Sequence, residues 1–422
     1  MQKRVAELFA GVGGFHVAFD KLNSGWDFVY ANQWEPGKKI QYAYENYLKH
    51  YGADEIVSNE DINKVNKKEI PDFDLLVGGF PCQDYSVART KAKGIEGKKG
   101  VLWWDIRDTI VAKTPPFILL ENVDRLLSSP GPKQRGRDFG MILYTLFQLG
   151  YGVQWRMVNA ADYGFPQRRR RVFIFAYRKD TNYYKTINVN EKNYEQFLTD
   201  HSSFADTLPM KDKLTLKKKI VIDDYLDIVD FSDNFTFKFE NTGILHENLV
   251  FTGKYESNYS GAYQILDDII EESVNDESLF LDNYPERMDK FQYLKGPKRL
   301  QRKSAEGYEY VYSEGGMVFP DPLDRPARTM LTSEHSVNRS THVVKDKETG
   351  RLRLLTPLEA ERIQTFPDNW TAEMPNSARY FMMGNALVTG LVSKMGEALD
   401  EIIMNETSMD KLDTADADLI KH

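Results

Sequence analysis

VAELFAGVGGFHVAFDKL, residues 5–22, combines a short apolar strand, a glycine-rich turn and an amphipathic helix. The rest of the first 180 residues repeats this alternation of strand and helix. The expected strands are residues 5–9, 28–31, 75–77, 117–120, 153–158 and 172–176, and the expected helices are residues 15–22, 38–50, 103–112 and 139–149. Such alternation predicts an α/β fold with a mostly parallel sheet and helices on both faces.

Three of the expected strands end in unusual loops. AGVGG follows residues 5–9, GGFPCQ follows residues 75–77, and ENV follows residues 117–120. Ligands of such sheets bind at the carboxyl ends of the strands. We therefore expect the functional site at these loops.

The rest of the chain is organised differently. From about residue 183 to 325 the alternation is lost and Asn, Tyr, Lys and Asp dominate, which indicates a second domain or large insertion of irregular structure. MMGNALVTGLVSKMGEALDEII, residues 382–403, is expected to form one amphipathic helix that packs back on the first domain. The tail after about residue 405 is expected to be disordered. The expected divisions are residues 1–182, 183–325, 326–372 and 373–422.

Composition limits the possible functions. Hydrophobic residues make up 41% and charged residues 28%, which is typical of soluble globular proteins, and no apolar run is long enough to span a bilayer, so we expect a cytoplasmic protein without a membrane partner. One cysteine excludes an intramolecular disulfide and a cysteine-based zinc cluster, and the seven histidines show no metal-binding spacing, so no metal is expected. The net charge of −8 argues weakly against nucleic acid, but a basic cleft can coexist with an acidic exterior.

Several polar positions are candidates for ligand binding. The glycines of ELFAGVGG, residues 7–14, let the backbone approach a ligand closely, although a tight turn without a ligand explains them equally well. Gln33, Trp34, Glu35 and Asp61 follow neighbouring expected strands, where they could hold a ribose and an adenine ring.

A second group of residues suggests covalent chemistry. Cys82 lies in the loop GGFPCQDYS, residues 78–86, where a thiol is accessible, although a lone cysteine is more often an inert buried residue. Glu121 follows an apolar strand, where a carboxyl suits a proton donor, although a helix-capping carboxylate is a common alternative. YGFPQRRRR, residues 163–171, supplies arginines that bind carboxylates or carbonyls, unless it is a solvated basic turn.

In their order and spacing, these motifs resemble the cytosine-5 DNA methyltransferases of bacterial and phage modification systems. ELFAGVGG resembles the family's first AdoMet motif, GGFPCQ its Pro-Cys motif, ENV its acid motif and QRRRR its Gln-x-Arg-x-Arg motif, while RPARTMLT and GNALV resemble its last two. The resemblance covers roughly residues 1–180 and 325–400. It implies a Rossmann-like AdoMet-dependent methyltransferase fold with a mixed sheet, a smaller target recognition domain at residues 183–325, and double-stranded DNA as substrate.

The resemblance also implies residue roles. Cys82 would attack C6 of a flipped-out cytosine, Glu121 would donate a proton at N3, and Arg171, with Arg169 behind it, would hold the O2 side and the active-site loop. Residues 84–100 would close over DNA and are expected to be mobile. The implied AdoMet pocket contains Phe9, Gly11, Gly13, Gln33, Trp34, Asp61, Ile62, Leu102 and Asn385.

One position departs from the family pattern, because the ribose-binding residue is usually acidic and Gln33 stands there. An amide still accepts hydrogen bonds from ribose hydroxyls, and Glu35 is a possible substitute. Two alternatives stay open: a branch of the family that methylates tRNA, and a binding protein that has lost catalysis. A monomer is expected, with a cognate restriction endonuclease as a possible functional partner.

Overall fold

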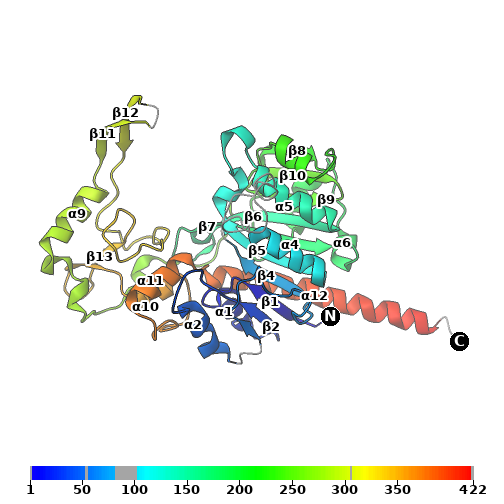
Figure 1. Cartoon of the computed structure of the whole chain (residues 1–422), viewed down its shortest axis with the longest axis horizontal. Helices are drawn as coiled ribbons and strands as arrows, with labels where there is room; N and C mark the ends of the chain where they lie inside the picture. Colours follow the sequence, from blue (N-terminus) through cyan, green and yellow to red (C-terminus); the bar gives the residue numbers. More distant parts are fainter. Residues whose placement is uncertain (1, 53–55, 81–101, 305–306, 420–422) are drawn as a thin grey trace. The chain divides into compact units, whose positions relative to one another are not determined.

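The computed structural model describes residues 2–52, 56–80, 102–304 and 307–419, with side chains described up to residue 406. The chain forms two compact units (Figure 1). The first comprises Met1–Tyr163, Arg170–Gly261 and Thr389–His422, and the second comprises Gly164–Arg169 and Ala262–Val388. None of the helices in the described residues is long and apolar enough to cross a membrane.

The first unit is built on one mixed sheet, which contains ten strands among the described residues in the order β3-β2-β1-β4-β5-β7-β6-β9-β10-β8. From β3 to β5 neighbouring strands run parallel, and from β5 to β8 they run antiparallel. The strands are β1 (Arg4–Leu8), β2 (Asp27–Asn32), β3 (Val57–Ser58), β4 (Leu75–Gly79), β5 (Phe117–Val123), β6 (Tyr151–Asn159), β7 (Arg170–Arg178), β8 (Thr215–Val221), β9 (Thr242–His246) and β10 (Leu249–Lys254).

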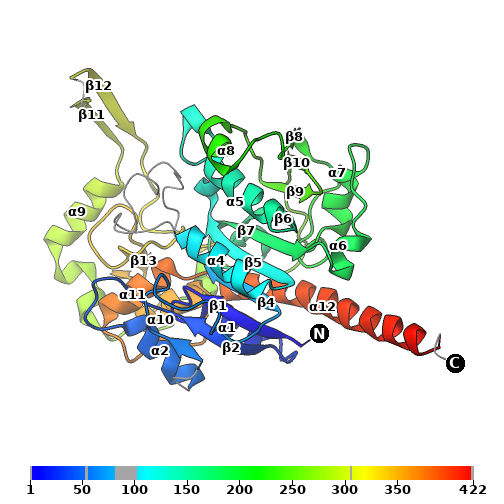
Figure 2. The same cartoon turned by 45° about the vertical axis from the view of Figure 1, so that its right-hand side comes forward.

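Helices cover both faces of this sheet. Ala6 and Leu8 share a buried core with Trp103 of α4 and Phe139 of α5. Side chains alternate along a strand, so Glu7 faces the opposite side, where α1 packs against α12 (Figures 1 and 2). The helices of this unit are α1 (Gly14–Asp20), α2 (Tyr42–Tyr51), α4 (Leu102–Lys113), α5 (Arg137–Gln148), α6 (Asn182–Thr186), α7 (Tyr194–Gln196), α8 (Ile228–Asn234) and α12 (Thr389–Leu419).

The predicted α/β fold is confirmed, and each strand and helix expected in the first 180 residues is present within a few residues of its expected bounds. The expectation of a mostly parallel sheet is wrong, because five of the nine strand pairings described in this sheet are antiparallel. The C-terminal part differs. The single helix expected over residues 382–403 is interrupted after Asn385 and resumes at Thr389 as α12, which continues as a helix to Leu419 where disorder was expected.

The division of the chain also differs from the expected one, because residues 183–261 belong to the first unit. Strands β9, β10 and β8 extend its sheet beyond β6. Trp155 of β6 lies opposite Gly243 of β9, and its indole N–H donates to the carbonyl of Glu240 at 3.2 Å. A Cβ on Gly243 would lie 2.2 Å from the Trp155 ring and 2.4 Å from the carbonyl oxygen of Phe251, so only glycine lets the two strands pair here.

The second unit has its own small core, formed by Leu279, Leu281, Phe291, Val343 and Leu354. Beside it, the fully buried guanidinium of Arg353 pairs with Asp346 at 2.9 Å and Glu359 at 2.7 Å. The helices and strands of the second unit are α9 (Pro285–Lys295), β11 (Lys298–Lys303), β12 (Glu309–Glu314), β13 (Val343–Lys345), β14 (Leu352–Leu354), α10 (Pro357–Ile363) and α11 (Asn376–Asn385).

Replacing Gly243 with alanine is expected to lower the free energy of unfolding by about 1–3 kcal/mol, because the added methyl overpacks the contact with Trp155. Chemical denaturation of the purified variant measures this. Gly315→Ala is the control, since a Cβ there meets no atom of the described part of the chain within 4 Å. Equal stability of both variants would show that β9 does not pack on β6 as described.

Candidate active site

The loop after β1 has a backbone suited to a bound ligand. Phe9 and Gly11 both have φ of 57°, and Gly13 has φ of 82°, so three of five successive residues lie in the left-handed region. Among the described residues, none would lie within 4 Å of a Cβ on Gly11, whereas a Cβ on Gly13 would lie 3.0 Å from the Tyr51 ring. Gly11 therefore borders open space, and Gly13 allows the loop to pack on α2.

Glu7 holds this loop from beneath. Its carboxyl is 1% exposed and accepts hydrogen bonds from the backbone N–H of Phe15 and from the Tyr47 hydroxyl, both at 3.2 Å. Burial raises the pKa of Glu7 to about 8, although these hydrogen bonds act in the opposite direction. No role for Glu7 was predicted from the sequence, although a charged residue within a short apolar strand is a signal of one.

Gln33 lies directly after β2 and is 8% exposed. Its side-chain oxygen accepts the Gly11 backbone N–H at 2.7 Å, so it fastens the glycine-rich loop to the neighbouring strand. Among the described residues, none hydrogen-bonds its amide nitrogen. Trp34 follows with 38% of its surface exposed.

Asp61 and Ile62 follow β3, the next strand along the same edge. The Asp61 carboxylate accepts the Asn63 backbone N–H at 3.2 Å, and Ile62 is buried. The parallel strands β1, β2 and β3 thus bring most of the predicted AdoMet residues to one edge of the sheet.

The loops after β4 and β5 meet at the same edge. In the parallel register, Gly79 lies opposite Glu121, and a Cβ on Gly79 would lie 3.3 Å from a Glu121 carboxyl oxygen. The side-chain amide of Asn122, 1% exposed, donates to the carbonyl of Phe80 at 2.8 Å. Asn122 therefore fixes the backbone two residues before Cys82, a role that the sequence analysis missed although an amide in a buried strand is unusual.

The two predicted arginines have different surroundings. The Arg171 guanidinium Nε lies 2.7 Å from a Glu121 carboxyl oxygen, and both side chains are mostly buried. Arg169 belongs to the second unit, where its buried guanidinium donates to the carbonyls of Met330 and Gly384, each at 3.1 Å. Arg171 thus orients the predicted acid, and Arg169 ties together the segments RPARTMLT and GNALV.

The remaining predicted site residues are Cys82, Leu102 and Asn385. Cys82 and the loop 84–100 lie outside the described residues. Leu102 is the first residue of α4 and is half-buried. Asn385 is the exposed last residue of α11, in the second unit. Their predicted roles stay predictions.

Known proteins resemble this chain in sequence and in fold. The C-5 cytosine-specific DNA methylase family matches residues 3–401. The chain belongs to this family. It is 48% identical over 409 residues to the type II methyltransferase M.Sau3AI of Staphylococcus aureus, a match covering 94% of this chain and 96% of that protein. It is also 24% identical to the orphan methyltransferase M.SPRI of Bacillus phage SPR, a match that covers 96% of this chain and 99% of that protein.

Solved structures show the same fold as this C-5 cytosine-specific DNA methylase. A mutant DNMT2 of Spodoptera frugiperda has a TM-score of 0.60 at 14% identity and covers 94% of this chain and 99% of its own. Dnmt2 of S. pombe has a TM-score of 0.56 at 15% identity, and the match covers 93% of this chain and 96% of Dnmt2. The predicted AdoMet-dependent methyltransferase fold is therefore confirmed.

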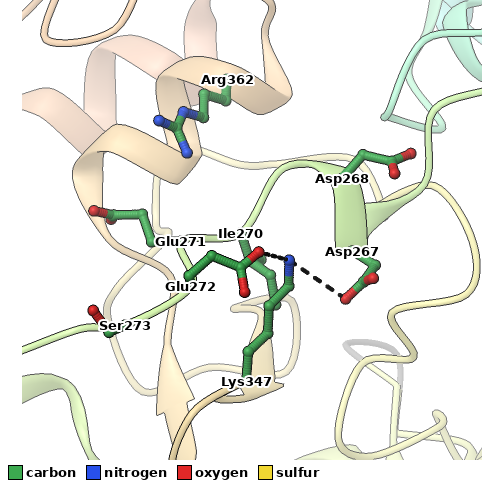
Figure 3. Close-up of a pocket in the computed structure, with 8 residues that line it drawn as sticks. All are labelled: Asp267, Asp268, Ile270, Glu271, Glu272, Ser273, Lys347 and Arg362. Atoms are coloured by element: carbon green, nitrogen blue, oxygen red, sulfur yellow. Dashed lines mark hydrogen bonds and ion pairs between the residues drawn. The ribbon is translucent and has the colours of Figure 1, made fainter.

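The methylase also has an acidic hollow in its second unit (Figure 3). Lys347 lies 2.8 Å from Glu272 and 3.7 Å from Asp267, and Glu271 accepts a hydrogen bond from Thr356 at 2.6 Å. These pairs fasten the segment around residues 267–272 to its neighbours. The hollow is lined by Asp267, Asp268, Ile270, Glu271, Glu272, Ser273, Lys347 and Arg362.

Glu7→Gln is expected to make the methylase less sensitive to rising pH. The folded-state pKa of about 8 exceeds the ordinary value of 4.5, so the folded chain holds a proton that the unfolded chain loses between these values. This group therefore lowers stability as pH rises through that window. When the pH is raised from 5.5 to 7.5, the free energy of unfolding of the variant should rise by on the order of 2 kcal/mol relative to that of the wild type.

Denaturant unfolding at the two pH values measures this difference. Glu348→Gln, at an exposed carboxyl, is the control and should follow the wild-type pH dependence. Parallel behaviour of Glu7→Gln and wild type would contradict the account of Glu7.

Proposed function

We propose that the chain transfers a methyl group from AdoMet to C5 of a flipped-out cytosine in a specific sequence of double-stranded DNA, through a covalent bond between Cys82 and C6. The observation that carries this proposal is the ion pair between Glu121 and Arg171 beside Gly79, three residues before Cys82. The reaction needs a thiol, a carboxyl and a guanidinium. The last two meet at one sheet edge, and Cys82 follows Gly79 of that edge by three residues in sequence.

AdoMet fits the edge formed by β1, β2 and β3. Open space beside Gly11 admits a ligand against the backbone, and the Gln33 amide nitrogen is oriented by the bond from its oxygen to Gly11. The exposed indole of Trp34 offers a flat apolar surface to an adenine ring. AdoMet supplies the reaction with a methyl group on a sulfonium, and the chain's own residues provide the rest.

The chemical steps follow from the residues. The Cys82 thiolate bonds to C6 while Glu121 donates a proton at N3, which leaves C5 nucleophilic. Arg171 holds the Glu121 carboxyl in place for this transfer. With AdoMet bound, C5 would take its methyl group and S-adenosylhomocysteine would leave. Loss of the C5 proton to a base would then break the bond to Cys82 and return the N3 proton to Glu121. The target base is reached outside the duplex, since both faces of its ring must be accessible.

The type II name of M.Sau3AI, the full-length relative at 48% identity, supports a DNA substrate and a restriction endonuclease as functional partner. No observation favours the tRNA alternative. We also propose that the second unit contributes target recognition, a role that the sequence analysis gave to residues 183–325.

A duplex with 5-fluorocytosine at the target position tests the covalent step. Fluorine is not lost from C5 as the proton is, so the methylated adduct should stay bound to the protein and migrate as a covalent complex on a denaturing gel. Wild type should form this complex only with AdoMet, and Cys82→Ser should form none. On normal DNA, Glu121→Gln should methylate about 100- to 10,000-fold more slowly.

Two controls make this experiment decisive. AdoMet binding by Cys82→Ser should remain, which shows that the protein is folded. Glu348→Gln, the same substitution at an exposed carboxyl, should retain the wild-type rate. A covalent complex formed by Cys82→Ser would overturn the assignment of the nucleophile.

A further inference from the structure

The strands β11 and β12 form an exposed hairpin in the second unit. Among the described residues they pair with each other and with no other strand. Residues 299–303 of β11 are all exposed, as are four of the six residues of β12. Figures 1 and 2 show the hairpin projecting beyond α9. An isolated two-stranded hairpin is marginally stable at best, so the pairing of β11 with β12 adds little to the stability of the protein.

The base of the hairpin, in contrast, is firmly held. Arg339 donates to the carbonyls of Leu294 at 2.7 Å and Gly296 at 3.3 Å, before β11, and to the carbonyl of Gly315 after β12. Its Nε also lies 3.0 Å from Glu314. One side chain therefore clamps both ends of the hairpin.

A buried lysine adds a second attachment. Lys295, 1% exposed, donates to the carbonyl of Thr341 at 2.5 Å, and its own carbonyl accepts the Met317 N–H at 2.7 Å. Asp321 lies 3.7 Å from its ammonium group. A projecting element with a rigid base is suited to present side chains in a fixed direction.

The two faces of the hairpin differ in how their polar groups are used. On the paired face, Lys298 lies 3.6 Å from Glu314, and the Arg302 guanidinium lies 4.0 Å from the centre of the Tyr312 ring. This face consists of Lys298, Leu300, Arg302, Tyr310, Tyr312 and Glu314.

All six residues of the open face are exposed: Arg299, Gln301, Lys303, Glu309, Val311 and Ser313. Lys303 and Glu309 form an ion pair of 3.3 Å. Among the described residues, none bonds to the side chain of Arg299 or Gln301. These two planar groups retain their full hydrogen-bonding capacity.

We propose that the open face of this hairpin enters the major groove of double-stranded DNA and that Arg299 and Gln301 contact base edges of the target sequence. The inference rests on the proposed function and assigns its specificity to two residues. A two-stranded ribbon fits the major groove, and arginine and glutamine make the bidentate contacts that distinguish guanine and adenine there.

The charges agree with this occupant. Strands β11 and β12 together carry four cations and two carboxylates, whereas the hollow around Asp267 carries four carboxylates and two cations. Phosphates are attracted to the first and repelled by the second. The open face has Val311 as its one large apolar residue, so it lacks the apolar core that a stable protein interface needs.

The test measures methylation rates of Arg299→Ala and Gln301→Ala on duplexes that carry the wild-type target and on duplexes with each base pair replaced in turn. For each variant, the rate on the target should fall about tenfold or more, and preference should be lost at one position. That position should be a guanine for Arg299→Ala and an adenine for Gln301→Ala.

Arg302→Ala is the matched control, because it removes the same charge from the same strand but from the paired face. It should lower all rates by a similar factor and leave the sequence preference unchanged. AdoMet binding and the unfolding midpoint should match wild type in all three variants.

Three other outcomes would overturn the inference. Unchanged rates and preference in both open-face variants, with an active wild type, would overturn it alone and leave the proposed function intact. A changed oligomeric state in these variants would assign the open face to a protein contact. A wild-type protein that methylates no DNA would overturn the proposed function together with this inference.

Discussion

The parallel pairing of β4 with β5 is the constraint on which the site depends. It places Gly79 opposite Glu121, and the antiparallel neighbour β7 then brings Arg171 within 2.7 Å of the Glu121 carboxyl. Asn122, the next residue of β5, holds the carbonyl of Phe80. Three strands that are distant in sequence thus hold Glu121, Arg171 and the backbone of Phe80 in place. These contacts form within the protein and need no bound ligand.

Much of the first unit could be predicted from its sequence, because buried parallel strands give continuous apolar runs and their loops carry recognisable residues. The extension by β9, β10 and β8 could not. The β8 sequence TLKKKIV is mostly polar and exposed, and the pairing of β9 with β6 depends on Gly243 meeting Trp155, a contact between residues far apart in sequence. The break between Asn385 and Thr389 was missed because the apolar pattern continues across it, although Gly384 and Asn385 are residue types that commonly end helices.

The candidate site shows the same contrast. Residue types at strand ends indicated Gln33, Asp61, Glu121 and Arg171, but not what each side chain contacts. The side-chain oxygen of Gln33 accepts the Gly11 N–H, a contact that a carboxylate would also make, so the amide keeps the loop attached without the negative charge expected there. Glu7 and Asn122 support the site from buried positions. A polar residue within an apolar strand marked each of them in the sequence, but its partner is known only from the hydrogen bonds.

The central claim is that this chain forms 5-methylcytosine in a defined DNA sequence. The most direct measurement is to incubate the purified protein with AdoMet and unmethylated genomic DNA and then to map 5-methylcytosine at base resolution. We expect methylation at one short recurring sequence and none with Cys82→Ser. Absence of 5-methylcytosine from DNA treated with a wild-type protein that binds AdoMet would contradict it.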